Sequence, residues 1–63
     1  MNFKHRGITG SCHYNHEMKM FVGELMKTDY LVTFKGGSVN EAKREFIKVT
    51  NKYLDSKNKT SKE

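Results

Sequence analysis

The chain has 63 residues, with 12 Lys and Arg against 7 Asp and Glu, so its formal net charge is +5. A chain of this length forms one domain with a small core. No apolar run approaches the roughly 20 residues of a membrane-spanning helix, and the start, MNFKHRGITGS, lacks the apolar stretch of a signal peptide. Cys12 is the only cysteine, so no internal disulfide forms, which is typical of a reducing compartment. We therefore expect a cytoplasmic protein without a membrane segment.

Three segments in the first half of the chain have strand patterns. Residues 7–14, GITGSCHY, alternate on a period of two, with the even-numbered positions on one face. The polar residues 15–19 predict a turn, and residues 20–26, MFVGELM, predict a second strand. Residues 30–34, YLVTF, are β-branched or aromatic almost throughout and predict a third strand. The connections are short, which favours an antiparallel meander.

One amphipathic helix is predicted to begin at Ser38. SVNE is a capping box, in which the Ser38 hydroxyl accepts from the Glu41 amide and the Glu41 carboxylate reaches back to the Ser38 amide. Spacings of three and four then define an apolar stripe, made of Val39, Ala42, Phe46, Val49 and Tyr53. No apolar residue follows Leu54, so we expect a single domain at residues 1–55 and a flexible polar tail at 56–63.

These elements predict an α+β fold, in which a three-stranded antiparallel β-meander is followed by one C-terminal α-helix packed on one face. The predicted core is Phe21, Val32, Phe34, Ala42, Phe46, Val49 and Tyr53.

The second strand is apolar in both registers. We favour the register with Gly23 under the helix, because a glycine lets a helix approach closely, and the opposite register stays open. In the favoured register the other face is left bare. Exposed apolar patches and open strand edges are association sites, so the candidate partner-binding residues are Met20, Val22 and Met26.

CHYNH, residues 12–16, suggests two kinds of site chemistry. Cys12 and His16 could ligate zinc, and Cys12 beside His13 suggests a nucleophile pair. Neighbouring strand residues point to opposite faces, however, and no second cluster of ligands is present. The acidic residues are scattered as well, so we expect no catalytic, cofactor-binding or metal-binding residue, and no enzyme activity.

An alternative function is that of a small basic nucleic-acid-binding protein. Sheet aromatics with basic neighbours can stack bases. The chain interleaves Phe3, Tyr14, Phe21, Tyr30 and Phe34 with Lys4, Arg6, Lys19, Lys27 and Lys35.

The order of motifs resembles the N-terminal domain of the HicB family of antitoxins. The resemblance covers about residues 3–55 and is carried by FVG at 21–23, VTFKGGSVNEA at 32–42, and Phe46 followed by Tyr53-Leu54. It implies a truncated RNase-H-like β-β-β-α unit without nuclease residues. It also implies binding and neutralisation of a small HicA-type ribonuclease toxin, by covering its catalytic histidine and RNA surface, and assembly into homodimers or tetramers.

The sequence departs from the HicB pattern in three respects. Gly37 stands where the family usually has an acidic residue, and the net charge is positive. The 63 residues include neither the family's fourth strand nor its C-terminal DNA-binding domain. Autoregulation through DNA binding would therefore need another chain to supply that domain.

Overall fold

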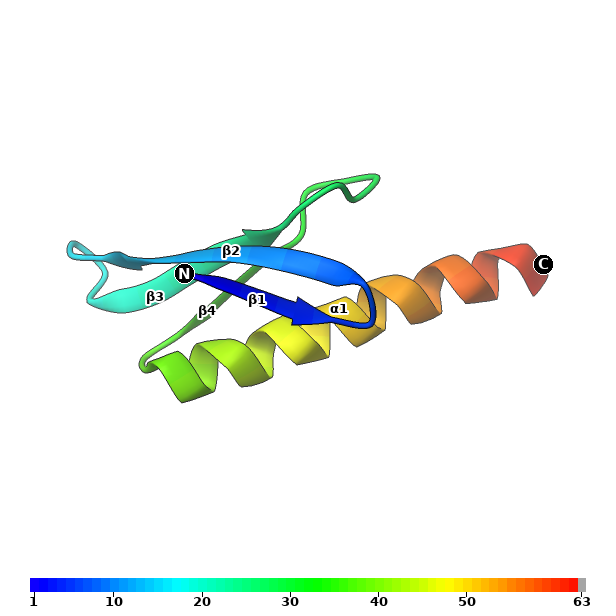
Figure 1. Cartoon of the computed structure of the whole chain (residues 1–63). Coiled ribbons are helices and arrows are strands. Elements are labelled where there is room, and N and C mark those ends of the chain that lie inside the picture. The colour runs from blue at the N-terminus through cyan, green and yellow to red at the C-terminus, as the bar shows by residue number, and fades with distance from the viewer. Residues whose placement is uncertain (63) are drawn as a thin grey trace.

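A four-stranded antiparallel sheet lies against one long helix in the computed structural model of the chain (Figure 1). The structure describes the backbone of residues 1–62 and the side chains of residues 1–57. The elements are β1 (Asn2–His5), β2 (Ile8–Asn15), β3 (Met20–Leu25), β4 (Thr33–Gly36) and α1 (Val39–Lys62). The strands follow one another across the sheet in chain order. The α+β class with a C-terminal helix is confirmed, whereas the predicted number of three strands is wrong.

The strand absent from the sequence prediction is β1. It pairs with β2 through a two-residue turn at Arg6-Gly7, which places His5 opposite Ile8. The φ angles of the two turn residues are 53° and 83°, as in the type I′ turns whose twist matches that of the flanking strands. A glycine adopts such an angle at little cost. The Phe3 ring then lies 5.5 Å from that of Phe46, so this short strand contributes a side chain to the core.

The last strand lies further along the chain than predicted. The structure places β4 at Thr33–Gly36 instead of residues 30–34. Tyr30 and Leu31 instead belong to the loop 26–32, where the Tyr30 ring packs edge-on against Tyr53 at 5.3 Å. The backbone N–H of Asp29 donates to the Tyr53 hydroxyl at 3.0 Å. The contacts with α1 therefore override the β-propensity of this segment.

The helix begins after Ser38, whose hydroxyl accepts a hydrogen bond from the Glu41 N–H at 3.2 Å. The reciprocal contact differs from the prediction, since Glu41 Oε1 accepts from the N–H of Gly37, at 2.8 Å, and not from that of Ser38. The chain turns at the two glycines, which brings the Gly37 amide within reach of the carboxylate. α1 continues past Leu54 to Lys62. The flexible tail predicted at 56–63 falls mostly on residues whose side chains lie outside the described part, and it stays a prediction.

The core lies between α1 and one face of the sheet. The buried apolar residues are Cys12, Leu25, Phe34, Ala42, Phe46 and Tyr53, and the partly buried residues that pack on them include Phe21, Val32 and Val49. Four residues of the predicted core are thus fully buried and three lie at its margin. The helix is rotated slightly from the predicted stripe, because Thr50 is completely buried while Val39 is 38% exposed.

Two glycines of the sheet make room for aromatic rings. A Cβ on Gly10 would lie 2.6 Å from the Phe46 ring, and one on Gly23 would lie 2.6 Å from the Phe34 ring. The register places Gly23 on the helix side, opposite Cys12 and Phe34, as the favoured register predicted. The close approach of the α1 backbone occurs at Gly36, however, and not at Gly23, because a Cβ on Gly36 would lie 2.5 Å from the Ala42 backbone nitrogen.

Candidate interaction surface

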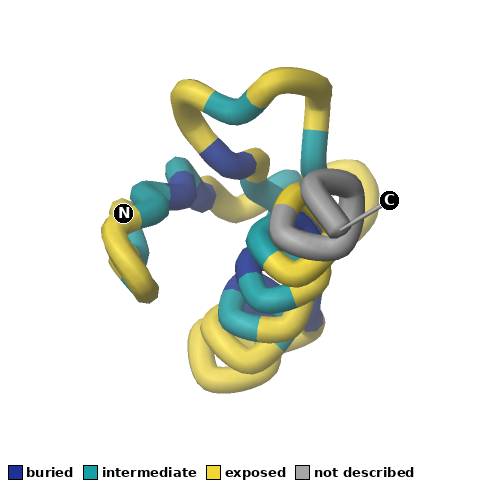
Figure 2. Tube along the Cα trace, turned by 90° about the vertical axis from the view of Figure 1, so that its right-hand side faces the viewer, coloured by how far each residue is buried: buried dark blue, intermediate teal, exposed yellow. Residues whose placement is uncertain are grey.

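The face of the sheet that points away from α1 has no covering element in the described structure. Figure 2 looks roughly along α1 and shows the strands on one side of the helix. The strand pairing fixes which side chains lie on this open face. They are Asn2, Lys4, Thr9, Ser11, His13, Asn15, Met20, Val22, Glu24, Thr33 and Lys35.

The three candidate partner-binding residues do not form one apolar patch. Met20 and Val22 are half-buried on the open face, whereas Met26 follows β3 and is 44% exposed. The backbone N–H of Met26 donates to the Thr9 carbonyl at 2.8 Å, so Met26 continues the register at the far end of the strand. Glu24 lies between Val22 and Met26 on the same face. The open face is therefore mostly polar, with two apolar side chains near one end.

A shallow hollow of about 720 Å³ lies over β2, β3 and β4 and reaches round to the flank of α1. Its walls combine hydroxyl, imidazole, carboxylate and ammonium groups with a few apolar side chains. The lining residues are Ser11, His13, Val22, Gly23, Glu24, Thr33, Phe34, Lys35, Glu45 and Val49. Such a surface offers hydrogen bonds and charge pairing to a partner more than it offers apolar burial.

The residues weighed for metal binding and nucleophilic chemistry are not brought together. Cys12 faces α1 and is 2% exposed, and burial raises the pKa of its thiol, which disfavours the reactive thiolate. His13 lies on the opposite face and is exposed, and the exposed His16 lies in the turn before β3. Among the described residues, no three His, Cys, Asp or Glu side chains are grouped closely enough to hold a metal ion.

The aromatic rings point to the helix side or to the loops. Phe34 lies 6.2 Å from Phe3 and 5.5 Å from Phe46, so these three rings form the centre of the core. Tyr14 packs edge-on against Phe21 at 5.1 Å, beside that centre. No phenylalanine or tyrosine belongs to the open face. The stacking rings on which the nucleic-acid alternative depends are therefore not available on this surface.

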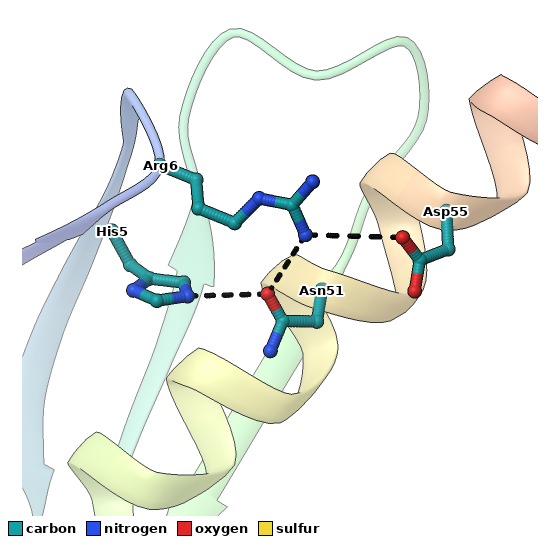
Figure 3. A network of polar contacts seen from close by, with 4 residues as sticks. All are labelled: His5, Arg6, Asn51 and Asp55. Carbon is teal, nitrogen blue, oxygen red and sulfur yellow. Dashed lines mark hydrogen bonds and ion pairs between the residues drawn. The ribbon is translucent and has the colours of Figure 1, made fainter.

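A polar network missed by the sequence prediction ties the turn between β1 and β2 to the middle of α1 (Figure 3). The side-chain oxygen of Asn51 accepts from Arg6 Nη1 at 3.0 Å and lies 3.1 Å from His5 Nε2. Arg6 Nη1 is also 3.8 Å from an Asp55 oxygen. No pattern in the sequence identifies these partners, because they are about 45 residues apart.

A second hollow, of about 330 Å³, lies where the loop 26–32 meets α1 between Tyr30 and Tyr53. The loop is held there by Asp29, whose carboxylate is 3.3 Å from Lys57 Nζ. The hydrogen bond with Asp29 raises the pKa of Lys57, and the negative charge of Asp29 adds to this effect. Leu31 lies at the rim of the hollow and is 72% exposed. The most exposed large apolar side chain of the described residues therefore lies outside the open face.

Searches of family models, of curated proteins and of solved structures found no match to this chain. Within the part of the chain that the structure describes, no helix has the length and apolarity needed to cross a membrane.

Proposed function

We propose that this chain is a non-catalytic interaction module of the HicB antitoxin type, which binds and neutralises a small HicA-type ribonuclease. The observation that carries the proposal is the open face, because one helix covers only one side of the four-stranded sheet. A sheet face without a covering layer is a place where another protein can dock.

The open face is less positive than the chain as a whole. It is therefore better suited to a protein partner with a basic surface than the net charge of +5 suggests. This face carries two lysines, Lys4 and Lys35, and one carboxylate, Glu24. The open face therefore carries a net charge of +1, and the rest of the chain's formal charge of +5 lies elsewhere. Glu24 and the hydroxyls of Ser11 and Thr33 supply acceptors for the cationic side chains of an RNA-binding surface.

The test is co-purification of the tagged chain with a small HicA-type ribonuclease, together with an assay of RNA cleavage by that enzyme. We expect a stable complex and loss of cleavage at an equimolar ratio. Val22→Lys should leave the fold intact, because Val22 lies on the open face, and should weaken binding at least tenfold by placing a charge in a desolvated contact.

Val39→Lys is the matched control, since Val39 is also partly exposed but lies at the start of α1. It should bind the ribonuclease as the parent chain does. Undiminished RNA cleavage with an excess of the chain would contradict neutralisation. Equal binding by Val22→Lys and the parent chain would contradict the choice of surface.

A further inference from the structure

The hydrogen-bond pattern of the sheet shows which backbone groups of β4 are unpaired. In an antiparallel pair, hydrogen-bonded residue pairs alternate with non-bonded ones. The Leu25 N–H donates to the Val32 carbonyl at 2.9 Å, so the bonded pairs that follow are Gly23 with Phe34 and Phe21 with Gly36. The N–H and C=O groups of Thr33 and Lys35 therefore point away from β3, towards the free edge.

We propose that a second copy of this chain pairs with the β4 edge, so that two four-stranded sheets join into one across a two-fold axis. Because only Thr33 and Lys35 present outward groups, a symmetric antiparallel pairing has three possible registers. Thr33 can face Thr33 of the partner subunit, Lys35 can face Lys35 of the partner subunit, or Thr33 can face Lys35 of the partner subunit. The last register makes about four backbone hydrogen bonds, the most of the three.

The charges on the open face select that last register. Two lysines directly opposite each other repel, which disfavours the pairing of Lys35 with the partner's Lys35. In the register with Thr33 facing the partner's Lys35, the ammonium group meets Glu24, because Glu24 stands next to Thr33 on the same face. The arrangement occurs twice by symmetry, so the interface gains two ion pairs between copies.

The other free edge, β1, lacks this complementarity. The Cys12 N–H donates to the Met1 carbonyl at 2.8 Å, so Asn2 and Lys4 are the residues whose backbone groups face outward from β1. Their neighbours on β2 are Ser11 and Thr9, which carry no negative charge. Self-pairing through β1, with Asn2 opposite the partner's Lys4, would therefore place each Lys4 beside neutral residues only, and the structure assigns the dimer to β4.

This pairing rests on the proposed role as an interaction module, but it has its own readout. The mass of the purified full chain is measured by sedimentation over a range of concentrations at low salt, without any ribonuclease. We expect a reversible monomer–dimer equilibrium. Thr33→Pro removes an outward N–H that the fold does not use, and it should abolish the dimer while the circular dichroism spectrum is preserved.

A charge exchange tests the register. Lys35→Glu and Glu24→Lys should each raise the dimer dissociation constant about tenfold, and the double variant should restore the value of the parent chain. Lys4→Glu and Asn2→Pro are the matched controls on β1, and they should leave the equilibrium unchanged.

The proposal would be overturned by a parent chain that stays monomeric at high concentration, by a Thr33→Pro variant that still dimerises, or by a double variant that does not recover. Loss of the dimer by the β1 variants, or growth into open-ended polymers, would instead show pairing that involves β1 and would overturn it too. If the monomeric Thr33→Pro variant still neutralises the ribonuclease, toxin binding does not need the dimer. Failure of the dimer proposal can therefore be distinguished from failure of the proposed neutralisation.

Discussion

Among individual residues, Thr50 is the buried polar side chain of the described core. It has no exposed surface, and its hydroxyl has no hydrogen-bond partner among the described residues. A buried hydroxyl without a partner costs about 1–3 kcal/mol. Hydropathy assigns threonine to the outer side of a helix, and only the packed position of α1 shows that it belongs to the core.

Thr50→Val should therefore raise the free energy of unfolding by about 1 kcal/mol, because it replaces the unpaired hydroxyl with a methyl group of the same shape. Urea denaturation of the two chains measures the difference. Thr50→Ser is the matched control, because it keeps the hydroxyl and removes the methyl group, and it should lower stability. A destabilised Thr50→Val chain would show that the hydroxyl does have a partner.

Among the helices and strands, those fixed by contacts between residues close in sequence were predicted accurately, whereas those fixed by contacts with distant residues were not. Local patterns place the strands near 7–14 and 20–26 and the start of the helix at Ser38, because alternation, turn residues and a capping box act within a few positions. β1 and β4 depend on distant partners. Phe3 is held by the rings of Phe34 and Phe46, and Tyr53 holds the segment that was expected to begin the last strand.

The same reasoning applies to the candidate site. The register with Gly23 under the helix, favoured over its equally apolar alternative, predicted Met20 and Val22 on the bare face, since side chains alternate with a period of two. It could not show that Lys4 and Lys35 share this face, because strand β1 was missing from the prediction and β4 was misplaced. The polar character of the surface therefore emerges only from the complete sheet.

The network around Asn51 offers a test of how the β1–β2 turn docks on α1. Asn51→Ala removes the acceptor shared by His5 and Arg6, and it should lower the free energy of unfolding by about 1 kcal/mol, as expected for partly exposed hydrogen bonds. The measurement is urea denaturation, with hydrogen exchange at β1 as a local readout. Lys52→Ala, at the next and exposed position of the helix, should change stability very little. Equal losses in both variants would contradict a specific docking role.

At the scale of the whole molecule, the positive charge and the open face are separate. Exposed basic side chains gather on the outer side of α1, at Lys43, Arg44, Lys48 and Lys52, while the sheet face that would stack bases has no aromatic ring. Nucleic acid would therefore meet the helix as a set of point charges. Binding of this kind depends on salt and carries no sequence preference.

The final prediction separates this electrostatic binding from true recognition of RNA by the sheet. With four cationic contacts, the dependence of affinity on salt concentration predicts that affinity for single-stranded RNA falls about 50-fold between 50 and 200 mM salt. Fluorescence anisotropy with two unrelated RNA sequences should show this fall, with equal affinities for both. Reversing Lys48 and Lys52 to Glu should abolish the binding, whereas reversing Lys4 and Lys35 on the open face should have a much smaller effect. Tight binding at 200 mM salt that is lost only in the open-face variant would place RNA on the sheet and favour a nucleic-acid-binding protein over an antitoxin.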